Sequence, residues 1–202
     1  MDPEPFESIR STFAPEDDTF LFARERAAAS ARPPSPGVGS LLRWIAGVSS
    51  AHTAVEVGSA GGVSGLHLIA GLGDTGALTS LESDPHTHAL AATAYAEAGI
   101  AGRIRSILGD PLTVLPRLSD GAYDLVVIQS HGDELTTLLE HAIRLLRVGG
   151  MLVVRGLTDL SGEVTGESLA GLLVDGGLVA TGLPLDDGVL LAMRTTDERA
   201  ED

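Results

Sequence analysis

The sequence contains no cysteine, no lysine and no asparagine among its 202 residues. The absence of cysteine excludes disulfide bonds, thiolate metal sites and cysteine nucleophiles. Because all 13 basic residues are arginine, no lysine can act as a general base or form a Schiff base. Without asparagine, no side chain of that type can ligate a metal ion. Any catalysis must therefore depend on the remaining polar side chains.

Basic charge is also scarce, with 13 basic against 28 acidic residues and a formal net charge of −15. Nucleic-acid binders usually carry a basic stripe, because neutralising phosphates drives their affinity. No such stripe is present, so we expect no nucleic-acid partner. No apolar run reaches the ~18 residues of a membrane span, and Met1-Asp-Pro-Glu4 lacks the basic segment that begins a secretory signal. We therefore expect no membrane partner and a cytoplasmic location.

Length and hydrophobic content predict a single globular domain. A chain of 202 residues with 44% hydrophobic residues can bury a sizeable core. The expected parts are an N-terminal arm (1–34) with a helix over Thr19 to Ser30, a core (35–194) and a polar tail (195–202). The proline-rich segment 31–37 separates the arm helix from a second helix over Val38 to Val48, because consecutive prolines cannot continue a helix.

Strands and helices alternate through the core. Apolar strands are expected at 53–57, 78–82, 104–107, 123–129 and 151–155. Helices are expected at about 63–72, 85–98, 134–147 and 160–175. This alternation predicts a parallel sheet with helices on both faces. Two apolar segments, Leu178 to Leu183 and Val189 to Met193, flank Pro-Leu-Asp-Asp-Gly and predict a β-hairpin.

The segment Ala54-Val-Glu-Val-Gly-Ser-Ala-Gly-Gly-Val-Ser64 connects the first strand to the helix that follows it. Its glycines predict a tight turn where backbone approaches a ligand, and the free N–H groups of the first helical turn point at that ligand. Glu56, near the strand end, can accept hydrogen bonds from an ammonium or hydroxyl group of the ligand. The segment therefore predicts a cofactor site.

The glycine spacing distinguishes between cofactors. A dinucleotide-binding turn requires G-x-G-x-x-G, but Ala60 and Val63 occupy the second and third glycine positions, which disfavours a nucleotide-cofactor oxidoreductase. The segment instead resembles the first motif of the class I S-adenosylmethionine (SAM) methyltransferases. It is most similar to the small O-methyltransferases of the catechol and caffeoyl-CoA type, with motif V-E-x-G-x-x-x-G-x-S. The fixed positions are Val55, Glu56, Gly58, Gly62 and Ser64. A generic strand-to-helix turn in another α/β protein is the alternative.

The resemblance covers the chain from Ser35 to Arg194 and implies a Rossmann-like fold. In that fold a mostly parallel seven-stranded sheet has helices on both faces and ends in an antiparallel β-hairpin. It also implies SAM as the cofactor and a small-molecule acceptor. In the resembled family the N-terminal segment covers the cofactor pocket and often helps to form a homodimer.

Two further segments resemble cofactor contacts of the family. Glu82, in Leu81-Glu-Ser-Asp-Pro85, matches the family pattern strand-E-x-x-P, whose acid accepts both ribose hydroxyls; a solvent-facing carboxylate is the alternative. Asp110, in Leu108-Gly-Asp-Pro111, matches a turn that contacts adenine, and it can also cap the next helix. The cofactor-binding residues that we expect are Glu56, Gly58, Ser59, Gly62, Ser64, Glu82, Ser83, Gly109, Asp110 and Gln129.

The sequence departs from the family where the family binds its metal. After the fourth strand the family carries V-D-A-D-K, whose first Asp binds a divalent cation and whose Lys takes the substrate proton. Here that run is Ile128-Gln-Ser-His-Gly132, so Gln129 replaces the Asp and Gly132 the Lys. Arg155-Gly156 replaces the Asp-Asn pair that completes the metal site. Because a hard cation requires several anionic oxygens, we expect no divalent metal in the usual position.

Methyl transfer does not itself require a metal, because the protein mainly aligns the acceptor with the sulfonium and deprotonates it where needed. His131 is the catalytic candidate, since histidine titrates near neutral pH; a solvent-facing loop histidine is the alternative. Arg155 can hold an anionic acceptor or pair with an acid such as Asp159. We therefore predict a metal-independent SAM-dependent O-methyltransferase. The alternative is a catalytically silent SAM-binding protein with an interaction or regulatory role.

Overall fold

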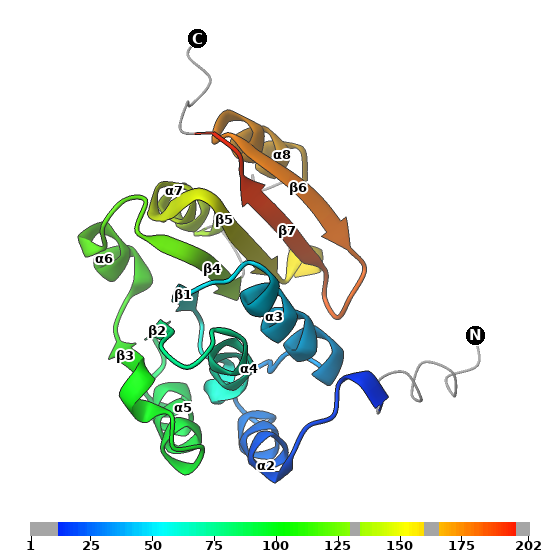
Figure 1. The fold of residues 1–202 in the computed structure, drawn as a ribbon, viewed down its shortest axis with the longest axis vertical. Helices are drawn as coiled ribbons and strands as arrows, with labels where there is room; N and C mark the ends of the chain where they lie inside the picture. Colours follow the sequence, from blue (N-terminus) through cyan, green and yellow to red (C-terminus); the bar gives the residue numbers. More distant parts are fainter. Residues whose placement is uncertain (1–11, 130–133, 160–165, 197–202) are drawn as a thin grey trace.

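The computed structural model describes residues 12–129, 134–159 and 166–196. These residues form one seven-stranded sheet with helices on both faces (Figure 1). The strands are β1 (Thr53–Val57), β2 (Ala77–Glu82), β3 (Ile104–Leu108), β4 (Tyr123–Gln129), β5 (Leu146–Arg155), β6 (Leu178–Leu183) and β7 (Val189–Arg194). The helices are α2 (Asp18–Ala27), α3 (Pro36–Val48), α4 (Val63–Gly71), α5 (Pro85–Glu97), α6 (Pro111–Val114), α7 (Leu135–Leu145) and α8 (Gly166–Asp175).

The strand order is β3-β2-β1-β4-β5-β7-β6. Strands β1 to β5 pair in parallel, and β7 pairs antiparallel with both β5 and β6. The expected mostly parallel sheet with a C-terminal β-hairpin is therefore confirmed. Strand β1 lies between β2 and β4, so the connections after β1 and after β4 leave in opposite directions across the sheet. Ligands of open α/β sheets bind at such a point, outside the carboxyl ends of the strands.

Alternate side chains of the central strands pack on opposite faces of the sheet. Val55, Val57, Val126 and Ile128 join a core cluster with residues of α7 and α8. Ala54, Leu125, Val127 and Val153 join a second cluster with residues of α3 and α4. A third cluster links α2, α4 and α5 through small residues such as Ala27 and Ala94. None of the helices in the described segments has the length and apolar character needed to cross a membrane.

Strand β5 begins at Leu146, earlier than the expected start at 151, and α7 correspondingly ends at Leu145. Leu146 is fully buried and pairs with Tyr123, after which the register shifts before Leu125. A Cβ on Gly150 would lie 2.8 Å from the carbonyl oxygen of Arg147. The glycine pair at 149–150 thus accommodates an irregularity within the strand, whereas the sequence pattern had indicated a helix stop.

The N-terminal arm is fastened to the core by a buried ionic cluster. Arg24 of α2 pairs with Glu16, and His67 of α4 lies 3.1 Å from the same carboxylate. Burial raises the pKa of Glu16, but hydrogen bonds from His67 and Arg24 outweigh it and lower this pKa to about 2. Arg24 also donates to the carbonyl of Pro34, in the loop between α2 and α3. The cluster therefore fixes the position of the loop that follows α2.

Candidate cofactor and acceptor site

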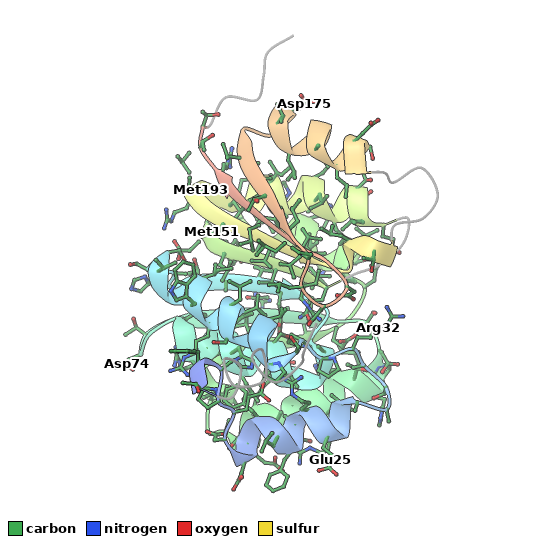
Figure 2. The ribbon with its side chains drawn as sticks, turned by 90° about the vertical axis from the view of Figure 1, so that its right-hand side faces the viewer. Glu25, Arg32, Asp74, Met151, Asp175 and Met193 are labelled. Atoms are coloured by element: carbon green, nitrogen blue, oxygen red, sulfur yellow. The ribbon has the colours of Figure 1, made fainter. Side chains whose placement is uncertain are left out.

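A pocket of about 480 Å³ lies at the carboxyl ends of β1, β2, β4 and β5. This volume is within the range of small-molecule sites. Its lining residues are Ala29, Ser30, Ala31, Arg32, Gly58, Ala60, Glu82, Asp84, Thr87, Gln129, Arg155 and Asp187. Residues 29–32 follow α2, and Asp187 lies in the turn between β6 and β7. Arg32, which Figure 2 labels, and Asp187 of that turn therefore line the same pocket.

The glycine turn after β1 forms the floor of this pocket. Gly58 has φ +85°, and a Cβ there would lie 2.5 Å from the carbonyl oxygen of Gln129 at the end of β4. Ala60 lines the pocket at φ +47°, an uncommon backbone conformation for a residue with a side chain. Gly62 has φ +94° and is required by its packing against α5, because a Cβ there would lie 3.0 Å from Ala91 and Ala94. The turn is therefore shaped by close packing as well as by the pocket.

Glu82 ends β2 and presents its carboxylate to the pocket while only 8% of the residue is exposed. Its Oε2 accepts hydrogen bonds from the backbone N–H of Ser59 at 3.0 Å and from the Ser59 hydroxyl at 2.7 Å. Its Oε1 accepts from the backbone N–H of Asp84 at 3.1 Å. A carboxylate has about four lone-pair positions. Glu82 is thus held in a fixed orientation, and about one lone-pair position is left to accept a hydrogen bond from a ligand.

Glu56 lies behind the pocket rather than in its lining. It is fully buried, and its carboxylate accepts hydrogen bonds from Ser64 at 2.7 Å, Ser80 at 2.6 Å and Tyr95 at 3.0 Å. We expected this carboxylate to face the ligand, because it lies near the end of β1. The side-chain alternation of the strand instead directs it away from the pocket, where hydroxyl groups from α4, β2 and α5 surround it. Its influence on the pocket must be indirect.

Burial makes Glu56 a source of pH-dependent stability. Burial raises its pKa from 4.5 to about 7, against the opposing hydrogen bonds of Ser80, Ser64 and Tyr95. The folded chain therefore binds this proton more tightly than the unfolded chain between these pH values. Stability from this group is fully present below pH ~4.5 and is lost as the pH rises through ~7. The difference between these two pKa values corresponds to roughly 3 kcal/mol.

We expect Glu56→Gln to remove this dependence. Urea unfolding of both proteins at pH 5 and pH 8 should show that the wild type loses roughly 2.5 kcal/mol more than the variant between these conditions, because the unfolded carboxyl group is already largely ionised at pH 5. The comparison between two pH values cancels the packing cost of the substitution itself. Parallel pH profiles of the two proteins would contradict a raised pKa for Glu56.

A chain of hydrogen bonds connects Glu56 to the pocket. Ser64 accepts from the Gln129 side-chain nitrogen at 2.8 Å, and the same nitrogen donates to the carbonyl of Gly58 at 2.8 Å. The Gln129 side-chain oxygen accepts from the guanidinium of Arg155. Because its nitrogen has these two acceptors, the amide must direct its oxygen toward Arg155. The residue at the family's metal position thus binds an arginine here.

Arg155 is 5% exposed and lies beside two acids of the β6–β7 turn. Its guanidinium is 3.5 Å from the carboxylate of Asp186 and 4.0 Å from that of Asp187. Burial lowers the pKa of Arg155 from its ordinary value, and the two acids oppose that change. Sequence reasoning missed both partners, because only the closed hairpin brings residues 186 and 187 to the end of β5. The side chain of Asp159, the partner we considered, is outside the described part of the chain.

The remaining candidates lie elsewhere or outside the described residues. Ser83 is exposed, and neither it nor Gly109 belongs to the pocket lining. Asp110 caps α6, accepting from Leu112 N–H at 2.9 Å and from the Thr113 hydroxyl at 3.0 Å, which is the capping role considered above. His131 falls in the segment 130–133, outside the described residues. Within the described ranges, no three His, Asp or Glu side chains come together as a metal site would require.

The sheet order and the pocket at its switch point define a class I methyltransferase fold. Residues 26–168 match the O-methyltransferase family. A candidate O-methyltransferase of Mycobacteroides abscessus is 41% identical over 192 residues, which cover 89% of each chain. Another of Mycobacterium tuberculosis is 38% identical and covers 89% of this chain and 86% of its own length. The chain therefore belongs to the O-methyltransferase family and is an enzyme of that family, as its motifs predicted.

Solved structures show the same architecture. A cofactor-bound protein from MTB superposes with a TM-score of 0.80 and 28% identity, over 95% of this chain and 96% of that one. The O-methyltransferase TomG from Streptomyces achromogenes, in complex with SAM, superposes with a TM-score of 0.83. At 24% identity, over 97% of this chain and 100% of TomG, that likeness concerns the fold alone.

Proposed function

We propose that this enzyme binds SAM in the pocket and transfers its methyl group to an oxygen atom of a small molecule, without a divalent metal. The single observation that carries the proposal is the oriented carboxylate of Glu82. It ends β2 beside the glycine turn and retains acceptor capacity toward the pocket. An acid in this position suits a hydroxyl group of a ribose. The structural neighbour from MTB, at 28% identity, was solved with its cofactor bound, which supports cofactor binding by this chain.

Other residues of the pocket would hold the cofactor around this anchor. The backbone of Gly58 and Ala60 forms the floor, and Ser59 fixes Glu82 through two hydrogen bonds. Gln129 lies beside the floor and connects it to Arg155. Glu56, Gly62 and Ser64 would act by shaping the turn from behind. Contact of Ser83 with the cofactor, contacts of Gly109 and Asp110 with adenine, and catalysis by His131 stay predictions.

The residues at the usual metal position do not suit a divalent cation. Gln129 offers one amide oxygen, and that oxygen already accepts from Arg155. The guanidinium of Arg155 carries a positive charge and no lone pair for coordination. Hard cations such as Mg²⁺ require several anionic oxygens. We therefore infer a reaction in which positioning and proton removal are supplied by side chains.

Turnover and binding measurements test the proposed function together. We expect SAM to bind with micromolar affinity in calorimetry, and SAM to be converted to S-adenosylhomocysteine with at least one compound of a phenol and catechol panel. The rate should be the same in EDTA and in Mg²⁺, and titration of Mg²⁺ into the SAM complex should show no micromolar site. Binding without turnover across the panel would favour the catalytically silent alternative, which none of the comparisons supports. Restoration of EDTA-abolished activity by Mg²⁺ would contradict the inference on the metal.

Two broader expectations also stay predictions: a cytoplasmic location and a homodimer. Exposed apolar side chains on the N-terminal helices, among them Phe22 at 56% and Trp44 at 62% exposure, are consistent with a buried contact in an assembly. Light scattering of the purified protein measures its mass directly.

A further inference from the structure

Arg155 and Asp187 form an incomplete polar pair at one end of the pocket. The Nε of Arg155 and the Oδ1 of Asp187 are both buried, and neither has a hydrogen-bond partner within the described residues. Both side chains belong to the pocket lining. A buried donor and a buried acceptor without partners are costly, and such groups in native proteins are explained by a catalytic role or by a water, ion or ligand that completes their bonding. The pair therefore marks a place for a ligand group that both accepts and donates.

The two groups are held in place by the surrounding backbone and side chains. Gln129 fixes one guanidinium nitrogen of Arg155, and Asp186 lies 3.5 Å from another. Asp186 in turn accepts from the backbone N–H of Ser35 at 2.9 Å. The carbonyl of Asp187 accepts from the backbone N–H of Thr158 at 2.9 Å and from the Thr158 hydroxyl at 3.0 Å. The pair is thus preorganised by the loop after β5 and the start of α3.

The charge around the pair disfavours an anion. The pocket is lined by three acids, Glu82, Asp84 and Asp187, and by two arginines, Arg32 and Arg155. Asp186 adds a further negative charge beside Arg155. The positive charge of Arg155 is therefore already compensated, and a carboxylate placed next to it would also meet Asp187. An uncharged hydroxyl avoids this repulsion, because its oxygen can accept from Arg155 while its hydrogen is donated to Asp187.

We propose that the Arg155–Asp187 pair is the acceptor subsite, and that it selects one uncharged hydroxyl group, as in a phenol or alcohol, over an anionic acceptor. The inference rests on the proposed SAM-dependent function. A divalent metal can chelate two neighbouring oxygens, whereas this pair engages a single hydroxyl. An adjacent second hydroxyl is therefore not required, and of the two roles considered for Arg155 this proposal disfavours the binding of an anionic acceptor.

The chemical step balances with the groups present. Arg155 donates to the acceptor oxygen and stabilises the negative charge that develops there. Asp187 takes the hydroxyl proton as the oxygen–methyl bond forms and the sulfur–methyl bond breaks, with its electron pair remaining on sulfur. The carboxylate and the sulfonium thereby lose their opposite charges together. General-base assistance of this kind contributes a factor of about 10² to 10⁴ in rate.

Methyl 4-hydroxybenzoate and 4-hydroxybenzoate test this selectivity, because each carries one phenol and only the second carries a carboxylate. We expect the ester to bind the enzyme–S-adenosylhomocysteine complex at least tenfold more tightly in calorimetry, and to be methylated at least tenfold faster in kcat/KM. Asp187→Asn should lower kcat for the ester about 100-fold. It should also narrow the preference for the ester, because the repelling charge is removed.

The matched control is Asp175→Asn, which makes the same change in charge at the end of α8, far from Arg32 in Figure 2. SAM affinity should stay within threefold of the wild type in both variants. If the wild type does not bind SAM, the proposed function itself fails. If SAM binds but the carboxylate is preferred, neither probe binds, or Asp187→Asn retains full kcat, the acceptor subsite is refuted while the proposed function stands.

Discussion

Replacement of Glu82 by alanine is expected to weaken SAM binding about 100-fold. A hydrogen bond between a ribose hydroxyl and this carboxylate contributes roughly 1.5 to 3 kcal/mol, and a loss of about 3 kcal/mol is a factor of about 100. The substitution also removes the acceptor for the backbone N–H groups of Ser59 and Asp84, which loosens the edge of the pocket. Calorimetric titration with SAM and with S-adenosylhomocysteine measures the effect.

The control is Glu25→Ala, which removes an exposed carboxylate of α2. Figure 2 labels Glu25 on this helix. Thermal unfolding without ligand separates a loss of binding from a loss of fold. Glu82→Gln adds a second test, because it retains the shape but lacks the charge and one acceptor. Wild-type affinity in a folded Glu82→Ala protein would refute the proposed cofactor site.

Gly58→Ala is expected to cause the largest loss of stability of any single methyl addition in the glycine turn. The added Cβ would lie 2.5 Å from the carbonyl oxygen of Gln129, which is backbone at the end of a central strand and cannot rotate away. Overpacking of this kind costs roughly 1 to 3 kcal/mol, and a left-handed residue with a side chain adds about 1 to 2 kcal/mol. A total near 4 kcal/mol would lower the melting temperature by about 10 °C in a domain of this size.

Gly121→Ala separates the two contributions. Gly121 also has a positive φ, of +62°, but an added Cβ would meet no atom within 4 Å. Only the backbone strain remains there, so we expect a loss of about 1 kcal/mol and a change of roughly 2 to 4 °C. Calorimetric melting of the three proteins gives the comparison. Equal losses in the two variants would show that the close approach of Gln129 to the turn is not what requires glycine at 58.

Local sequence patterns were sufficient to predict most of the fold. The alternation of apolar strands with capped helices predicted all the parallel strands and the C-terminal hairpin, since each signal lies within a few neighbouring residues. The start of β5 was misplaced because Gly149-Gly150 also has the form of a helix stop. Only the pairing of Leu146 with Tyr123 reveals that the strand begins before it.

The candidate site was predictable only in part. Gly58, Glu82 and Gln129 line the pocket as expected, because strand ends of a parallel sheet meet at one edge. The direction of Glu56 depends on its alternation along β1 and on the hydroxyl of Tyr95 in a distant helix. Asp187 gave no signal beyond its position in a hairpin turn, since only tertiary structure brings that turn to Arg155. Recognition of such partners requires knowledge of the closed sheet.

The hydrogen bond from Ser35 to Asp186 has a consequence for how the enzyme matures on the ribosome. It connects positions 151 residues apart in the chain. The wall of the pocket that contains the acceptor subsite can therefore close only after nearly all of the domain has emerged, whereas the glycine turn and Glu82 are translated much earlier. A nascent chain stalled before the β6–β7 turn would hold the elements of the cofactor half of the pocket and be unable to methylate anything.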